Sequence, residues 1–221
     1  MLINRFPTPY LQSNMYLITE GDRGIIIDPY DGGEYIKRIS GLVKEIDYIF
    51  LTHEHFDHIS GTDTLRERFR ANVLCSEVCA DKIKSAKSNA SHYFAAYVRL
   101  QDDEEVSDAM LSVGDYETYA DETFTGEEEL QWEGHKFILK ETPGHSPGSI
   151  CILLDQAYIF TGDTLLDDDT LMTRFPGGST KMWEKMAFPY LESLPKDTVV
   201  KPGHYDEFIL GNRMERYRRQ K

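Results

Sequence analysis

A dense run of metal-binding residue types is the strongest constraint in this sequence. Three histidines and an aspartate fall within the six residues His53-Glu54-His55-Phe56-Asp57-His58, immediately after Ile46–Thr52, a run typical of a short buried strand. In a tight loop, His53 and His55 can face one side and bind one cation, while Asp57 and His58 turn towards a neighbouring position. Imidazole and carboxylate suit zinc, iron and manganese, and no cysteine lies nearby to complete a closed structural zinc site. The segment therefore predicts an open, catalytic metal site.

Three further candidate ligands lie far along the chain, each at a predicted strand end beside glycine or proline. Glycine beside each candidate lets the backbone approach closely in a turn. A single histidine or aspartate in a loop is more commonly a cap or a surface group, but seven such residues together are better explained as ligands of two adjacent cations. The three are His145 in Pro143-Gly144-His145, Asp163 in Gly162-Asp163-Thr164, and His204 in Pro202-Gly203-His204.

The first half of the chain alternates strand-like and helix-like patterns. Apolar residues at helical spacing predict helices, and β-rich runs bounded by turn residues predict strands. Thr62 is the expected N-cap of the second helix. The expected strands are 12–19, 24–28, 46–52 and 71–76, the first two forming a hairpin that ends on Asp28, and the expected helices are 33–45, 62–70 and 77–87.

The second half has another set of strand-like runs, separated by turn dipeptides. A helix is expected over 180–194, broken or kinked at Pro189 because proline lacks the backbone N–H. Two strand sets with helices before and between them predict an α/β fold of the layered sandwich type. The expected strands are 130–132, 135–141, 149–154 and 157–161, which form an antiparallel set, and a last short strand over 198–201.

Length and charge limit the domain count and the partners. The 221 residues predict a single domain, 1–221, or at most a tight pair, because single cores grow to about 250 residues before chains divide. The formal charge is −14, and twelve acidic residues without any Lys or Arg fall between 101 and 129, whereas the other 192 positions carry 26 acidic and 24 basic residues. This stretch is expected to lie in an acidic surface insertion over about 88–129. Its field disfavours nucleic acid as a partner, so a small-molecule substrate is expected.

The sequence has no pattern typical of export or of membrane insertion. The N-terminal segment lacks a basic stretch followed by an apolar run, and nowhere do about 18 apolar residues follow one another. Cys75, Cys79 and Cys151 are odd in number and match neither a redox pair nor a zinc knuckle, so reduced core cysteines are expected. These features predict a cytoplasmic protein with no membrane partner, and they allow a homodimer.

The candidate ligands resemble those of the metallo-β-lactamase superfamily, whose signature H-x-H-x-D-H is present in the segment 53–58. The resemblance runs from Asp28 to His204 and implies a four-layer αββα sandwich. Asp28 matches the structural acid that supports the histidine loop in this family. The resemblance also implies the ligand sets, with the first metal held by His53, His55 and His145, the second by Asp57, His58 and His204, and Asp163 bridging the two.

Within the superfamily, the segments around Asp163 and His204 and the run Arg174–Ser179 resemble the glyoxalase II branch. Glyoxalase II carries a further C-terminal helical domain, whereas seventeen residues follow His204 here, so the resemblance does not extend to specificity for glutathione thioesters. An aspartate at 163, where a bridging carboxylate is expected, and an aspartate rather than a cysteine among the second-site ligands set the chain apart from the β-lactam-cleaving enzymes. Antibiotic hydrolysis is therefore not predicted.

The expected chemistry is hydrolysis by a dinuclear metallo-hydrolase. Two adjacent cations share a water whose pKa falls towards about 7, which supplies a metal-bound hydroxide at neutral pH. The predicted substrate is a small thioester, ester or lactone, cleaved by a hydroxyacylglutathione hydrolase-like or lactonase-like enzyme. Asp57 is the expected catalytic residue because it can ligate the metal and orient the hydroxide proton, and Asp28 would orient the imidazoles. Two divalent ions are expected, zinc first, with iron or manganese as alternatives.

Alternative functions stay open. The persulfide dioxygenases resemble this chain and use a single iron with oxygen. An RNA-processing nuclease of the same superfamily is disfavoured by the acidic balance, and a non-catalytic binding module is disfavoured by the intact ligand set. His92 and His135 are not expected as ligands, and Glu54 and Phe56 are expected to pack or to face solvent.

Overall fold

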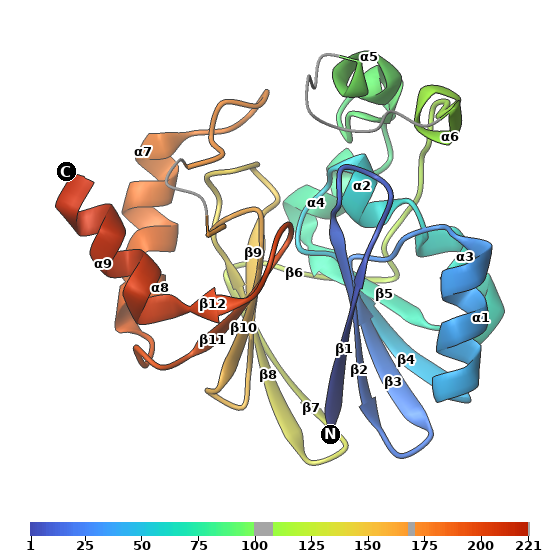
Figure 1. Ribbon diagram of the computed structural model, residues 1–221, viewed down its shortest axis with the longest axis horizontal. Helices are drawn as coiled ribbons and strands as arrows, with labels where there is room; N and C mark the ends of the chain where they lie inside the picture. The colour runs from blue at the N-terminus through green and yellow to red at the C-terminus, as the bar shows by residue number, and fades with distance from the viewer. Residues whose placement is uncertain (100–107, 168–170, 221) are drawn as a thin grey trace. The chain divides into compact units, whose positions relative to one another are not determined.

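The computed structural model describes residues 1–99, 108–167 and 171–220. The chain divides into two compact units, Met1–Thr123 and Phe124–Lys221. Each unit is built on one six-stranded sheet with helices packed against it (Figure 1).

The sheet of the first unit combines antiparallel and parallel strands in the order β1-β2-β3-β4-β5-β6. Its first three strands pair antiparallel, and β3, β4 and β5 are parallel, as expected where helical crossovers join them. Parallel strands have their carboxyl ends at the same edge of a sheet. In open α/β sheets, the loops that follow these ends commonly form the binding site. The strands are β1 (Leu2–Pro7), β2 (Asn14–Glu20), β3 (Arg23–Ile27), β4 (Glu45–Phe50), β5 (Asn72–Ser76) and β6 (Glu122–Phe124).

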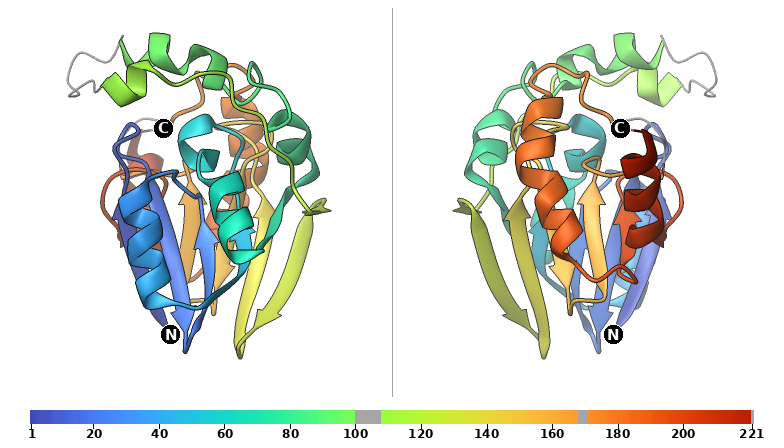
Figure 2. Two further views of the ribbon diagram at one scale, coloured as in Figure 1. Left: turned by 90° about the vertical axis from the view of Figure 1, so that its right-hand side faces the viewer. Right: turned by 90° about the vertical axis from the view of Figure 1, so that its left-hand side faces the viewer.

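Helices cover one face of this sheet, and their apolar sides build its core. Ile39 of α1, Leu65 of α3 and Cys79 of α4 join a buried cluster with Ile26 and Ile49 of the sheet. Figure 2 (left) shows α1 and α3 in front of the strands. The α-helices described in this unit are α1 (Gly33–Leu42), α2 (Phe56–Ile59), α3 (Thr62–Phe69), α4 (Glu77–Lys82), α5 (Phe94–Val98) and α6 (Asp108–Leu111), with a 3-10 turn at Ser91–Tyr93.

The predicted elements of the first unit are present with shifted ends. Thr62 is not the N-cap of α3: Gly61 holds that position, and the Thr62 hydroxyl donates to the Ile59 carbonyl at 2.6 Å. The helix predicted over 33–45 ends at Leu42, because Glu45 already begins β4. The helix predicted over 77–87 ends at Lys82, and β1 was not predicted because a single residue of this edge strand is buried.

The sheet of the second unit has the order β12-β11-β10-β9-β8-β7. The predicted antiparallel set is confirmed for β7 to β10, while β10 and β11 pair parallel across a helical crossover. All five residues of β9 are buried, as in a strand covered on both faces. The strands are β7 (Glu127–Trp132), β8 (His135–Glu141), β9 (Ile150–Leu154), β10 (Tyr158–Gly162), β11 (Val199–Pro202) and β12 (Phe208–Ile209).

The helix predicted over 180–194 is irregular, as Pro189 requires. It begins as α7 (Thr180–Met182), passes through a π-helical turn at Trp183–Ala187 and continues as α8 (Phe188–Ser193), with the proline in the first turn of α8. Proline there removes one backbone donor and its ring crowds the preceding turn, which explains the irregularity. A last helix, α9 (Leu210–Gln220), was not predicted. Figure 2 (right) shows α7, α8 and α9 in front of the second sheet.

The acidic stretch is attached to the first unit at several points. The Thr118 N–H donates to the Ile83 carbonyl at 3.1 Å, and the Asp121 N–H donates to the Val73 carbonyl at 2.9 Å. Its last residues belong to β6 and β7. The acidic residues between 102 and 105 lie outside the described residues. In the described ranges, no helix is long and apolar enough to cross a membrane.

A prediction arises from Asp155 at the turn between β9 and β10. Partial burial acts to raise the pKa of its carboxyl, but the Lys136 N–H at 2.9 Å and the His135 ring at 2.6 Å lower that pKa, with a net shift below the usual value of 3.8. A depressed pKa in the folded state stabilises the fold above the unfolded value, and this stabilisation is lost as pH falls through the folded value. Asp155→Asn should therefore lower the midpoint of thermal unfolding at pH 7. The difference from the parent protein should shrink below pH 4, and a difference that grew towards acid would contradict the assignment.

Candidate metal centre

The histidine loop of the first unit follows β4 and leads into α2. His53 and His58 are buried, with exposed fractions of 1% and 0%, and Asp57 is also buried. The His53 ring lies 4.7 Å from the His55 ring and 4.3 Å from the His58 ring, measured between centroids. His55 caps the N-terminus of α2, so the helix start fixes the direction in which Asp57 and His58 leave the loop. The structure therefore gathers all four predicted residues of this segment.

Asp28 holds this loop from the end of β3. Its Oδ1 accepts the Thr52 N–H at 2.7 Å, and its Oδ2 accepts the Thr52 hydroxyl at 2.6 Å and lies 3.0 Å from His58 Nδ1. Asp28 has a φ of +53°, a left-handed conformation that aspartate tolerates better than most residues. The carboxylate is thus fully engaged with the loop, which makes it a support for the imidazoles.

These hydrogen bonds determine which ring nitrogen of each histidine carries the proton. An ionised carboxylate only accepts, so His58 donates its Nδ1–H to Asp28 and keeps its Nε2 lone pair. The Thr52 hydroxyl gives its single hydrogen to Asp28, so at 3.0 Å from His53 Nδ1 it accepts the His53 Nδ1–H. His53 therefore also presents Nε2 as a lone pair, which is the usual effect of outer partners on metal-binding histidines.

Asp57 lies beside the Nε2 atom of His58. Its Oδ2 is 3.4 Å from His58 Nε2, and its backbone carbonyl accepts the Ser13 hydroxyl at 2.9 Å. A carboxylate oxygen and an imidazole nitrogen at this separation suit a shared oxygen- and nitrogen-binding cation. The loop therefore brings an oxygen and a nitrogen donor together.

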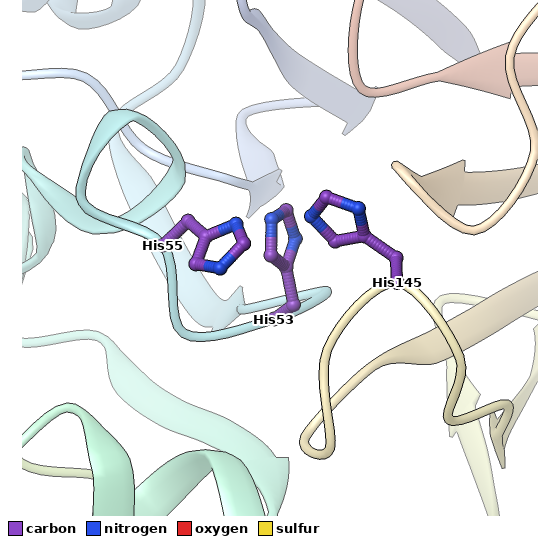
Figure 3. A group of neighbouring side chains, drawn as sticks. All are labelled: His53, His55 and His145. Carbon is purple, nitrogen blue, oxygen red and sulfur yellow. The ribbon is translucent and has the colours of Figure 1, made fainter. Parts of the chain in front are cut away.

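The second unit gathers the other three predicted residues around one carboxylate oxygen. Asp163 Oδ2 lies 3.5 Å from His145 Nε2 and 3.4 Å from His204 Nε2. His145 donates its Nδ1–H to the Met172 carbonyl at 2.6 Å, which again leaves Nε2 as the lone pair. His145 lies in the loop after β8, and His53 and His55 lie in the loop after β4 (Figure 3). Asp163 and His204 follow β10 and β11.

Gly144 allows the loop that contains His145 to pass close to the π-helical turn at Trp183–Ala187. A Cβ built at Gly144 would lie 2.5 Å from Trp183 Cβ and 2.9 Å from Trp183 Cα, distances that no side chain tolerates. The close approach is reinforced by the Ser179 N–H, which donates to the Gly144 carbonyl at 2.7 Å. Glycine therefore places His145 by fitting the loop against the π-helical turn.

The donor set of the described residues fits a cation with nitrogen and oxygen ligands. Burial raises the pKa of the Cys151 thiol to about 12, despite hydrogen bonds from Thr142 and Thr164 that lower it, and burial also raises the pKa of Cys79. Both thiols stay protonated at neutral pH and are poor ligands. Buried imidazole lone pairs beside buried carboxylates are thus the available ligands, which favours zinc, iron or manganese.

Several residues of this arrangement were not predicted from the sequence. The Thr52 hydroxyl, the Ser13 hydroxyl and the Met172 carbonyl all act through hydrogen bonds to ligand residues. Thr52 could have been found because it precedes the histidine run directly. Met172 could not, because its carbonyl is 27 positions away from His145.

The two histidines that were not expected as ligands each lie beside an aspartate. His92 pairs with Asp115 at 2.8 Å and His135 with Asp155 at 2.6 Å, in each case on the exposed surface. Glu54, which was expected to pack or to face solvent, is buried with 1% of its side chain exposed.

Comparison with known proteins places these observations in a family. Residues 8–204 match the family model of the metallo-beta-lactamase superfamily. The probable metallo-hydrolase YqgX of Bacillus subtilis is 30% identical over 92% of this chain and 90% of its own. The hydroxyacylglutathione hydrolase of Salmonella typhi is 27% identical over 92% of this chain, which spans 66% of the length of that enzyme.

Solved structures agree with this family assignment. The BLEG-1 B3 metallo-beta-lactamase has a TM-score of 0.78 at 25% identity, with 97% of each chain covered. TTHA1623 in a di-iron-bound form has a TM-score of 0.72 at 26% identity, with 96% of each chain covered. The two mixed sheets flanked by helices are thus the fold of these proteins, and the chain belongs to the metallo-β-lactamase superfamily.

Proposed function

We propose that this chain is a dinuclear metallo-hydrolase. One cation would be held by His53, His55 and His145, and the other by Asp57, His58 and His204, with Asp163 bridging. The observation that carries this proposal is the gathering of the candidate side chains, with His58 Nε2 3.4 Å from Asp57 Oδ2 and Asp163 Oδ2 3.5 and 3.4 Å from the Nε2 atoms of His145 and His204. Membership of the superfamily over residues 8–204 supports it.

The protein's own groups would orient the reaction. When bound, divalent cations lower the pKa of water towards about 7 and polarise a substrate carbonyl. Asp57 would hold the proton of the attacking water on its carboxylate. Asp28 and Thr52 would keep the histidine rings in their binding tautomers, so no rearrangement is needed when substrate arrives.

The proposed substrate is a small thioester, ester or lactone, which water splits into a carboxylic acid and a thiol or alcohol. The names of the Bacillus and Salmonella relatives support hydrolysis, at 30% and 27% identity. Zinc is the proposed metal, and the di-iron form of a similar protein makes iron the first alternative.

Further proposals concern the partners and the location of the protein. A small-molecule partner is supported by the charge of −14, which disfavours nucleic acid. A cytoplasmic location is supported by three buried free cysteines. The single-domain organisation, the absence of a membrane partner and the homodimer stay predictions.

A panel of substrates tests the proposed function. The protein, purified without chelator, is assayed on an acyl thioester, a nitrophenyl ester and a lactone, before and after chelation and again after zinc is restored. We expect turnover of at least one substrate, a loss of about a hundredfold or more on chelation, and recovery with zinc. Hydrolysis unaffected by complete metal removal would contradict the proposal, and one iron per chain with oxygen uptake on a persulfide would replace it by a dioxygenase.

A further inference from the structure

Phe56 lies between two of the proposed ligands, and its ring packs into an aromatic cluster. The ring centroid lies 5.1 Å from that of Phe94, 5.6 Å from that of Tyr116 and 5.7 Å from that of Tyr10. The side chain is 6% exposed. His55 on one side and Asp57 on the other therefore cannot move without displacing a buried ring.

The cluster joins the histidine loop to the segment that follows α4. Phe94 and Val98 come from α5 and Met110 from α6, and all three belong to the same buried cluster as Phe56. Tyr10, from the connection between β1 and β2, touches both Phe56 and Phe94, at 5.7 and 5.3 Å between centroids. Residues of α5 and of α6 thus belong to the same hydrophobic cluster as Phe56.

Hydrogen bonds made by the backbone and the side chain of Asn89 reinforce the same connection. The Phe56 N–H donates to the Asn89 carbonyl at 2.9 Å. The Asn89 amide group, which is fully buried, donates to the Tyr116 carbonyl at 2.7 Å and to the Ile83 carbonyl at 3.3 Å. Its Oδ1 accepts the Ser91 N–H at 2.9 Å. One asparagine therefore fixes both the outgoing and the returning part of this segment beside the histidine loop.

We propose that Phe56 is a positioning residue that couples the cation ligands His55 and Asp57 to α5 and α6. The inference rests on the proposed function, since it assigns the coupling to the same cation site. Because close-packed clusters resist continuous deformation, a cation that fixes His55 and Asp57 also fixes Phe56 and the helices around it. Coupling between two equilibria is reciprocal, so loosening α5 or Phe56 lowers cation affinity. The segment after α4 is thereby a part of the metal site rather than a surface appendage.

The test compares two identical substitutions in the first unit. Phe56→Leu removes the ring beside the ligands, and Phe6→Leu removes another buried ring, 2% exposed, in the core of the sheet. Zinc-loaded protein is titrated with a competing chelator, and hydrogen exchange of residues 94–98 is followed with and without zinc. We expect both variants to lower the thermal midpoint, but only Phe56→Leu to weaken zinc binding, by about tenfold. In Phe6→Leu, as in the parent protein, zinc should slow exchange in α5, and in Phe56→Leu this protection should fall.

The outcomes separate this inference from the proposed function. If Phe56→Leu does not fold, Phe94→Leu, one ring further from the ligands, is expected to raise the zinc dissociation constant by a smaller factor of about three. The inference would be overturned if zinc affinity and hydrogen exchange in α5 changed to the same extent in Phe56→Leu and Phe6→Leu. The proposed function would remain intact in that case. A parent protein that binds no zinc, iron or manganese would overturn both.

Discussion

Asp163→Asn is expected to lower kcat/KM for hydrolysis by about a thousandfold while the protein stays folded. The carboxylate offers one oxygen to both His145 Nε2 and His204 Nε2, at 3.5 and 3.4 Å, and asparagine has the same shape without the charge. Loss of a charged ligand between two cations removes several kcal/mol of electrostatic stabilisation, and each 1.36 kcal/mol changes a rate about tenfold. The measurement is kcat/KM together with metal content and the thermal midpoint.

Asp155→Asn is the matched control for this prediction. It removes one carboxylate from the same unit, at the turn that ends β9 and outside the cluster around Asp163. The control should keep kcat/KM within about twofold, as is usual for surface changes away from a site. Activity close to that of the parent protein in Asp163→Asn would show that Asp163 does not bridge cations.

Asp28→Asn is expected to weaken cation binding by about 10- to 100-fold and to destabilise the fold. The two Asp28 oxygens accept three hydrogen bonds, from the Thr52 N–H, the Thr52 hydroxyl and His58. Asparagine has only one oxygen, so at least one buried donor loses its acceptor, at a cost of about 1–3 kcal/mol. His58 and His53 also lose the fixed tautomers that present Nε2, and loss of such outer partners typically costs this range of metal affinity.

Two substitutions at Thr52 refine the Asp28 prediction. Thr52→Ser keeps the hydroxyl that connects Asp28 to His53 Nδ1, whereas Thr52→Val removes it at nearly the same volume. Competition with a chelator should show a weakened site in Thr52→Val and a nearly unchanged site in Thr52→Ser. The tautomers assigned to His53 and His58 would be contradicted if Asp28→Asn, Thr52→Val and the parent protein bound the cation with equal affinity.

The ligand candidates could be predicted from the sequence because their chemistry is local and distinctive. A single histidine or aspartate in a loop is commonly a cap or a surface group, but seven of them in this pattern together point to metal binding. The structure gathers His53, His55, Asp57 and His58 in one loop and His145, Asp163 and His204 around one oxygen. Their role as ligands stays a proposal, while the family and the fold are confirmed.

What the sequence left open depends on tertiary contacts. Phe56 stands at a variable position of the motif, and only its contacts with Phe94 and Tyr116 explain its burial. The start of α3 shows the limit of prediction at the level of one residue, since Gly61 rather than Thr62 holds the N-cap position and the two residue types have similar N-cap propensities. The missed helix α9 did carry a signal, because Leu210, Met214 and Tyr217 recur at helical spacing and are all buried.

The most direct test of the central claim is the metal content of protein purified without chelator, measured by elemental analysis per chain. The account predicts close to two equivalents of zinc, iron or manganese, falling towards one or none in Asp163→Asn. Folded parent protein that contains no such metal and takes up none from a zinc-containing buffer would contradict it.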